Sequence, residues 1–305
     1  ERVRDLAVSL GFQEIITYTL TGQSRLDRVV SPSDTRRLSP LGVVNPVAAQ
    51  HTFLRTTLRA GLLETYSANR RHHEGTLRLF EVGFEYLPVE ADLPHERPVL
   101  CALAGGARQT RWGQPATDRL DFYDAKGAVA AMLERLGVTA TYTPSTGFGL
   151  LDGHGASIRA GQDEVGVVAQ VHPGTAASFD IDEPVFLIEV WLEELARVLP
   201  ERPAYTPPSR FPEVRQDIAL LIDESTPAAS VLQLVRGHRS GAVRLLADVF
   251  DDYRGEGLPA GKKSLALHLR YQAPDRTLTD DDVARIQSGL LKRLEKELGA
   301  VIRGA

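Results

Sequence analysis

Few side chains in this sequence stand at the spacings that catalysis or metal binding requires. The glycines at 104–106 and 255–261 fit neither the phosphate-binding loop nor the dinucleotide-binding pattern, so no nucleotide cradle is predicted. His72 and His73 are adjacent, and on a helix they would face about 100° apart, which favours solvated helix-end positions over a shared metal ion. Four acidic residues are interpreted as a charged sheet edge and a helix start: Glu183, Glu189, Glu193 and Glu194. No catalytic residue and no metal ligand are therefore expected.

The composition excludes several classes of protein. The chain has 305 residues, 43% hydrophobic and 25% charged, which is typical of globular domains. No apolar run reaches the roughly 18 residues of a membrane span, so no membrane partner is expected. The lone cysteine, Cys101, can form neither an internal disulfide nor a thiolate cage, which favours a reducing cytoplasm. Because the chain starts at Glu1 without a methionine or an apolar leader, we interpret it as part of a longer protein.

The net charge of −5 conceals an asymmetry along the chain. From Tyr205 onward, 15 Lys and Arg residues stand against 14 Asp and Glu, whereas the preceding residues carry 20 and 26. Neither part is basic enough to bind nucleic acid through its bulk charge. Any contact with RNA must therefore come from individually placed side chains.

Prolines are concentrated in one stretch, at positions 200, 203, 207, 208 and 212. Since proline fixes φ and lacks an amide donor, this stretch should be extended and semi-rigid. It predicts two domains, at residues 1–200 and 212–305, joined by a proline-rich linker at 201–211.

Residues 212–305 alternate between strand and helix patterns. Strands are predicted at 217–222, 242–250, 263–271 and 300–302, with helices that begin at Thr226 and Thr279 and end at Gly237 and Gly299. The third strand should turn two sets of side chains to opposite faces: Leu265, Leu267, Leu269 and Tyr271 against Ser264, Ala266, His268 and Arg270. The order βαββαβ predicts a ferredoxin-like fold with one open sheet face.

The first domain has a less regular pattern in which strands outnumber helices. Helices are predicted at 3–10, from about residue 57, and at 121–137, and strands at 15–20, 76–87, 97–104, 156–160, 165–171 and 184–191. Without a strict alternation of strand and helix, we expect an α+β domain built on an antiparallel sheet.

Several short segments together resemble the β subunit of bacterial phenylalanyl-tRNA synthetase, over essentially the whole chain. The segments are Val-Asn-Pro at 44–46, Phe-Leu-Arg-Thr-Thr-Leu-Arg-Ala-Gly-Leu-Leu at 53–63, Leu-Phe-Glu-Val-Gly at 79–83, Arg-Phe-Pro-Glu-Val-Arg-Gln-Asp at 210–217, Val-Phe-Asp-Asp-Tyr-Arg-Gly at 249–255, Gly-Lys-Lys-Ser-Leu-Ala at 261–266 and Arg-Thr-Leu at 276–278. The last four occur at the expected places on the βαββαβ frame.

The resemblance implies a class II aminoacyl-tRNA synthetase-like first domain without catalysis. Class II sites hold ATP with an arginine in one motif and a glycine-rich segment ending in another arginine. Residues 185–191 have neither, Glu189 there would repel a phosphate, and strand 77–83 offers only Arg78. The family implies that ATP and Mg²⁺ serve the catalytic α subunit, with which β forms an α2β2 heterotetramer. The first helix and the helix from Thr57 could contact α or could fill their own core.

For the last domain, the resemblance implies binding of the anticodon of tRNA(Phe). It assigns base stacking to Tyr253, recognition of guanine to Asp251 and a further polar contact to Ser264, with four possible phosphate contacts: Arg254, Lys262, Lys263 and Arg276. The family's usual Arg-Arg-Asp is Arg-Gln-Asp at 215–217, so the resemblance does not carry a contact over to the middle position. From the residues alone, Tyr253 could be a core aromatic, Asp251 a turn residue and the lysines part of a solvated loop.

Two other functions compete with a non-catalytic part of the ligase. One is a self-sufficient class II-like enzyme that activates an amino acid, and the other is a scaffold whose last domain binds protein. Pyrophosphate exchange tests the first alternative, and titration with RNA tests the second.

Overall fold

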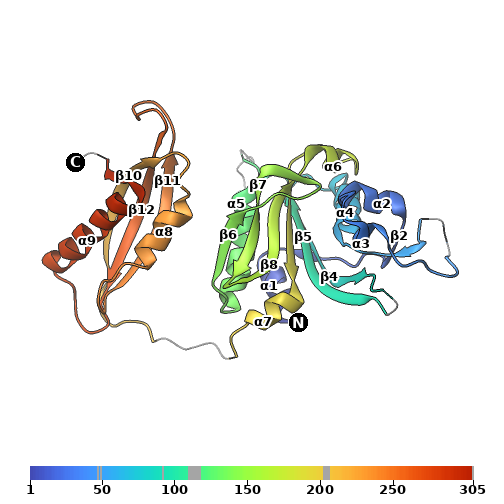
Figure 1. The fold of residues 1–305 in the computed structure, drawn as a ribbon, viewed down its shortest axis with the longest axis horizontal. Coiled ribbons are helices and arrows are strands. Elements are labelled where there is room, and N and C mark those ends of the chain that lie inside the picture. The colour runs from blue at the N-terminus through green and yellow to red at the C-terminus, as the bar shows by residue number, and fades with distance from the viewer. Residues whose placement is uncertain (47, 49, 91–92, 109–117, 202–206, 304–305) are drawn as a thin grey trace. The chain divides into compact units, whose positions relative to one another are not determined.

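The computed structural model describes residues 1–46, 48, 50–90, 93–108, 118–201 and 207–303. The chain divides into two compact units, unit 1 at Glu1–Pro203 and unit 2 at Ala204–Ala305. Residues 202–206 of the expected linker lie outside the described residues. Figure 1 shows both units, and each is described by itself.

Unit 1 is built on a seven-stranded sheet in the order β1-β4-β5-β9-β8-β7-β6. The strands are β1 Gln13–Glu14, β4 Leu77–Leu87, β5 His95–Gly105, β6 Ala140–Pro144, β7 Leu150–Ala160, β8 Asp163–Val171 and β9 Val185–Trp191. Every pair of neighbours is antiparallel except β1 and β4, which are parallel. An antiparallel sheet with helices is the arrangement that the sequence predicts for this part of the chain.

Helices cover both faces of this sheet (Figure 1). On one face lie α1 Arg2–Ser9, α5 Phe122–Arg135 and α7 Leu192–Val198, and on the other α2 Gln23–Val29, α3 Thr35–Leu38, α4 Arg59–Arg70 and α6 Pro173–Ala177. Because side chains alternate along a strand, Phe80 joins the first core and Leu79 the second. Ala7 of α1 and Leu62, Leu63 and Tyr66 of α4 are buried in the cores of their own unit, as the second alternative for these helices expects, whereas Val8 of α1 is 56% exposed.

The predicted strand at 15–20 is wrong. Only Gln13–Glu14 and Leu20–Thr21 (β2) are strands, and β2 pairs with β3 Phe53–Leu54. Between them, the Thr17 hydroxyl donates to Glu81 at 2.6 Å and accepts from Arg55 at 2.9 Å. These side-chain bonds hold the segment away from a regular ladder, and Ile16 is 92% exposed.

Unit 2 has the predicted βαββαβ order. Its strands are β10 Val214–Asp223, β11 Arg244–Tyr253, β12 Lys262–Gln272 and β13 Val301–Ile302, and its helices are α8 Ala228–Arg236 and α9 Asp280–Leu298. The sheet order is β11-β12-β10-β13 with antiparallel neighbours, which is the ferredoxin-like arrangement. The four residues predicted to share the core face, Leu265, Leu267, Leu269 and Tyr271, are all fully buried. Both helices pack on that face, and among residues 207–303 no helix covers the other face (Figure 1).

The ends of α9 confirm the prediction, and the start of α8 corrects it. Thr279 and Asp282 form a reciprocal capping box, and Gly299 ends α9 in the left-handed region at φ 61°. The N-cap of α8 is Pro227 and not the predicted Thr226, because the Thr226 amide donates to the Asp223 carbonyl in a turn that precedes the helix.

Candidate functional site

Strand β11 contains a β-bulge at Phe250. Val249 pairs with Leu267 and Asp251 pairs with the next residue, Ala266, so Phe250 is an extra residue on its strand. Because side chains alternate with a period of two, one extra residue shifts the alternation of everything that follows it. The residues after Phe250 therefore change sides of the sheet.

This shift places Asp251 and Tyr253 on the face without helices, which we call the open face. Before the bulge, Leu245 and Ala247 are buried against the helices, and a regular strand would put Asp251 and Tyr253 on that same side. Tyr253 instead pairs in register with Ser264, on the side opposite the buried row of β12. Neither Asp251 nor Tyr253 is a core residue, since both are exposed.

The Tyr253 ring is held by two contacts, and the residue remains 38% exposed. Its hydroxyl donates to the Glu256 carbonyl at 3.1 Å, and the Arg303 guanidinium lies over one face of the ring, 5.3 Å from its centroid. A Cβ at Gly255 would lie 2.7 Å from the hydroxyl oxygen, so only glycine leaves room for the ring in this position. The ring is thus oriented and still accessible to a partner.

Ser264 differs from its prediction. The sequence predicted that Ser264 lies accessible on the open face, but it is only 3% exposed. It does lie on the predicted side of β12, in register with the larger Tyr253, and it is not accessible there.

The structure separates the four predicted basic contacts. Arg254 bonds Asp252 at 3.0 Å, and Lys262 pairs with Asp223 at 2.7 Å, both at the same sheet end as Tyr253. Arg276 follows the far end of β12, roughly 26 Å of strand away from Ser264, so it does not join them.

Lys263 corrects the prediction of a solvated lysine. Its side chain is 4% exposed and pairs with Asp252 at 3.2 Å, because Lys263 shares the helix-facing side with Leu265. The hydrogen bond from Arg254, together with the Lys263 ammonium, holds the pKa of Asp252 below its ordinary value. Lys263 is therefore engaged within the fold.

Sequence reasoning missed most of the open face beyond Tyr253. A hollow of about 630 Å³ is lined by Arg215, Asp217, Asp248, His268 and Arg270. Asp217 pairs with His268 at 2.6 Å, and Asp248 pairs with Arg270 at 2.7 Å. The alternation of β12 did place His268 and Arg270 on this face, which was the available signal.

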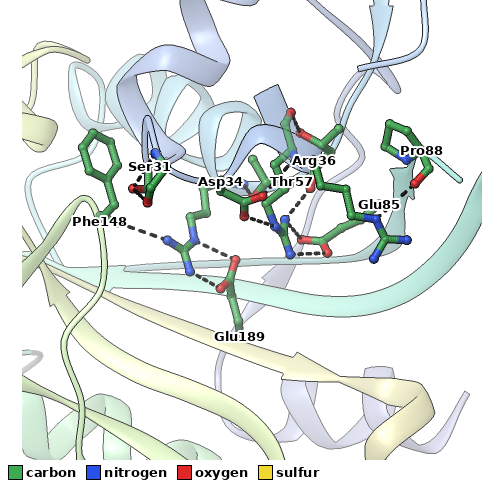
Figure 2. Close-up of polar contacts among 12 residues, drawn as sticks. Ser31, Asp34, Arg36, Thr57, Glu85, Pro88, Phe148 and Glu189 are labelled. Carbon is green, nitrogen blue, oxygen red and sulfur yellow. Dashed lines mark hydrogen bonds and ion pairs between the residues drawn. The ribbon is translucent and has the colours of Figure 1, made fainter. Parts of the chain in front are cut away.

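Unit 1 contains a second polar cluster, which is buried. Four glutamates pair with arginines: Glu81 with Arg55 at 2.7 Å, Glu85 with Arg37 at 3.0 Å, Glu183 with Arg70 at 2.6 Å and Glu189 with Arg59 at 2.9 Å. Figure 2 shows Glu85 and Glu189 each meeting a guanidinium beneath the helices. An unpaired buried carboxylate costs several kcal/mol, roughly, so each arginine compensates its partner.

Two of these glutamates flank the buried cysteine on one row of the sheet. Glu81 pairs in register with Cys101, and Cys101 with Glu189. Arg55 and Arg59, from the segment at 53–63 that carries the family resemblance, neutralise the two carboxylates. Burial opposes ionisation of Glu189, but the Arg59 guanidinium outweighs it and lowers the pKa of Glu189. Burial also raises the pKa of the Cys101 thiol, which is therefore no nucleophile.

The interpretation of the acidic residues was half right. Glu193 and Glu194 begin α7 as predicted, but Glu183 and Glu189 are buried and not a charged edge. Arg78, the arginine that the strand offered, donates to the Leu10 carbonyl at 3.0 Å.

For metal binding and membrane spanning, the structure gives observations on the described residues only. His72 and His73 are exposed beyond the end of α4, as expected, and within residues that the structure describes no group of His, Cys, Asp or Glu could hold a metal ion. In the same part of the chain, no helix is long and apolar enough to cross a membrane.

Each of the two units matches a known family model. The model of the phenylalanyl tRNA synthetase beta chain CLM domain matches residues 1–192, and that of the ferredoxin-fold anticodon binding domain matches residues 209–303. The phenylalanine–tRNA ligase beta subunit of Dehalococcoides mccartyi (strain CBDB1) is 39% identical over 99% of this chain and 36% of its own length. That of Geobacter sulfurreducens is 38% identical over 99% of this chain and 38% of its own length, so the chain spans little more than a third of such relatives. With a family model covering well over half of its residues, the chain belongs to the phenylalanyl-tRNA synthetase β-chain family.

Proposed function

We propose that this chain is the carboxy-terminal part of a phenylalanine–tRNA ligase β subunit, and that unit 2 holds the anticodon loop of tRNA(Phe). The observation that carries the proposal is the bulge at Phe250, which turns Tyr253 and Asp251 onto the open face. The match of this unit to a ferredoxin-fold anticodon binding domain supports it.

The chemistry of these residues suits a splayed RNA base. Tyr253 offers an accessible ring for stacking, and Asp251 is an exposed acceptor for the N1 and N2 donors of guanine, which adenine lacks at those positions. Ser264 is buried, so it can supply a further hydrogen bond only if the groups around it move to admit a base. Arg254, Lys262 and Arg276 remain proposed phosphate contacts, and each would exchange a carboxylate for a phosphate.

Unit 1 is proposed to have the class II synthetase-like fold without its catalysis. Residues 1–200 and 212–305 would be the two domains, joined by the linker at 201–211. The groups on the sheet face covered by α2, α3, α4 and α6 do not fit a nucleotide: Glu81 and Glu189 are buried there, and Arg55 and Arg59 are committed to them. Free guanidinium groups are what a triphosphate requires, so ATP and Mg²⁺ are assigned to the α subunit alone.

The partners proposed for the complete protein are tRNA(Phe) and a catalytic α subunit in an α2β2 heterotetramer. A cytoplasmic location fits a protein whose single cysteine is a buried free thiol. The buried ion pairs of unit 1 are formed between residues of this chain, without a contribution from tRNA or the α subunit.

Titration with an anticodon stem-loop RNA tests the proposal. Tyr253→Ala should weaken binding about 5- to 150-fold, since loss of a stacking aromatic costs about 1–3 kcal/mol per base. Asp251→Asn should reduce the preference for guanine over adenine at the first anticodon position. Tyr123→Ala removes an aromatic that is 74% exposed in unit 1 and is the matched control. Unchanged affinity in both unit 2 variants would overturn the proposal.

Pyrophosphate exchange separates this proposal from a self-sufficient enzyme. The chain alone should show no exchange dependent on phenylalanine and ATP, because its buried arginines have no free guanidinium for a phosphate. Addition of the α subunit with the rest of β should give exchange. Turnover by the isolated chain would contradict the assignment of catalysis to α.

A further inference from the structure

The geometry points to a second base-stacking platform on the open face, formed by Phe250 and supported by His268. It would take a different base of the same single-stranded loop from the one that Tyr253 holds. The inference rests on the proposed function, and adds a residue that the resemblance did not assign.

Phe250 is an exposed aromatic with one face of its ring already covered. Its ring stacks on His268 with centroids 4.0 Å apart and planes 17° from parallel. His268 is itself fixed by Asp217 at 2.6 Å. Phe250 is nevertheless 51% exposed, so a rigid apolar surface faces solvent. A preoriented ring costs little entropy to bind, which is the property of a stacking platform.

Packing on His268 covers only part of the Phe250 side chain and leaves apolar surface exposed to solvent. The hollow that its partner His268 lines is otherwise lined by charged residues, among them Asp248, Asp217 and Arg270. An apolar ring that is half exposed among charges gains free energy when a flat partner covers it, in proportion to the apolar area removed from water. Aromatic side chains on an open four-stranded sheet are one established way to bind single-stranded bases.

Polar groups around the ring can recognise the edge of a base. Asp217, Asp248 and Asp251 lie on the same face, and the first two are paired with His268 and Arg270. A carboxylate can accept hydrogen bonds from the amino groups at the edge of a base. The adjoining hollow of about 630 Å³, which His268 lines, leaves space beside the ring.

Phe250 and Tyr253 must serve different bases. They are three positions apart on β11, and the residues beside them on β12, His268 for Phe250 and Ser264 for Tyr253, are four positions apart, which corresponds to about 13 Å of strand. A base that lies flat on one of these rings cannot also lie flat on the other. The two residues therefore form two platforms along the path of one loop.

Binding of an anticodon stem-loop RNA to the full chain tests the platform. Phe250→Ala and Phe250→Leu should each weaken binding about 5- to 150-fold, the range for loss of one stacked base, whereas Phe250→Trp should bind at least as well as the unchanged chain. Leucine is the matched control for volume, because it keeps an apolar side chain without a π face. Thermal unfolding of each variant verifies that unit 2 stays folded. Equal affinity for Phe250→Leu and the unchanged chain would overturn the inference.

Removal of single bases identifies which nucleotide each platform holds. Stem-loops with one abasic position at a time should reveal the base that Phe250 holds: its loss should weaken binding to Tyr253→Ala, which keeps Phe250, and have no effect on binding to Phe250→Ala. Loss of the base that Tyr253 holds should weaken binding to Phe250→Ala and have no effect on binding to Tyr253→Ala. If Tyr253→Ala is impaired and Phe250→Ala is not, the second platform fails and the proposed function stands. If neither is impaired, the proposed function fails as well.

The supporting role of His268 has its own readout. His268→Ala should weaken binding in the unchanged chain and have no further effect in the Phe250→Ala background, because His268 acts through the orientation of the ring. In Phe250→Trp, RNA should quench the emission that the new indole adds to that of Trp112 and Trp191, and His268→Ala should reduce that quenching. Additive effects of His268→Ala and Phe250→Ala on affinity would contradict the positioning role.

Discussion

Arg55 and Glu81 form an ion pair at 2.7 Å in which the side chains are only 7% and 4% exposed. Arg55 also donates to the Phe84 carbonyl at 3.0 Å, and Glu81 accepts from Thr17. A Cβ at Gly83 would collide with the Arg55 guanidinium, so glycine is required there. The segments at 53–63 and 79–83, which carry part of the family resemblance, thus meet at one buried pair.

Removal of one member of this pair should destabilise unit 1 strongly. Arg55→Met leaves Glu81 buried without its counter-charge and should lower the free energy of unfolding by about 3–5 kcal/mol. The double variant Arg55→Met with Glu81→Met removes both charges and should recover most of that loss. Arg71→Met breaks a pair with Asp180 whose side chains are 65% and 81% exposed, and should cost less than about 1 kcal/mol. Denaturant unfolding measures all four chains, and a double variant no more stable than Arg55→Met would contradict the argument.

Acid should destabilise unit 1 through Glu189. Arg59 outweighs burial and lowers the pKa of Glu189 in the folded chain below its ordinary value of 4.5. The unfolded chain therefore takes up a proton first as the pH falls, and the stabilisation present above pH 4.5 is lost below it. In denaturant unfolding from pH 7 downward, the stability difference between the unchanged chain and Glu189→Gln should shrink below about pH 4.5. A difference that stays constant through this range would show that Glu189 does not titrate as argued.

The secondary structure of unit 2 was predictable because its signals are local. The alternation from Ser264 to Tyr271 and the capping residues Thr279 and Gly299 each follow from neighbouring residues. The bulge at Phe250 was not predictable, since register depends on the partner strand as well as on the strand itself. A strand prediction for 242–250 therefore said nothing about the side on which Tyr253 lies.

The buried charge cluster could not be predicted for a similar reason. Arg59 and Glu189 are 130 residues apart in sequence, and no local pattern joins them. The sequence correctly indicated that the strand with Glu189 lacks the arginines of a nucleotide site. It did not indicate that arginines reach the same sheet face from another segment. The expected failure to bind a phosphate therefore has a different cause: the guanidinium groups are present, but they are already paired with glutamates.

Lys263 should contribute to the stability of unit 2 and not to phosphate binding. Lys263→Met removes the 3.2 Å bond to Asp252 and should lower the free energy of unfolding by about 1.5–3 kcal/mol, the usual cost for a bond to a charged group. The slope of log RNA affinity against log salt concentration should stay unchanged, because the Lys263 ammonium is already paired with Asp252. Loss of a true phosphate contact would reduce the size of that slope by about 0.7. The neighbouring Lys262→Met, with a side chain 32% exposed, is the matched control and should cost less than about 1 kcal/mol of stability. A reduced slope for Lys263→Met would restore it as a phosphate contact.

Gly255→Ala should weaken RNA binding through the position of the Tyr253 ring. The added Cβ would lie 2.7 Å from the tyrosine hydroxyl oxygen and 2.8 Å from its Cζ, so the ring must move. Titration with the stem-loop should show a loss of affinity that is smaller than that of Tyr253→Ala, because a displaced ring still stacks in part. Gly127→Ala adds a Cβ in α5 with no atom within 4 Å and should leave affinity unchanged. If Gly255→Ala binds like the unchanged chain while Tyr253→Ala does not, the orientation of the ring before binding is irrelevant, and contact with the base alone determines the affinity.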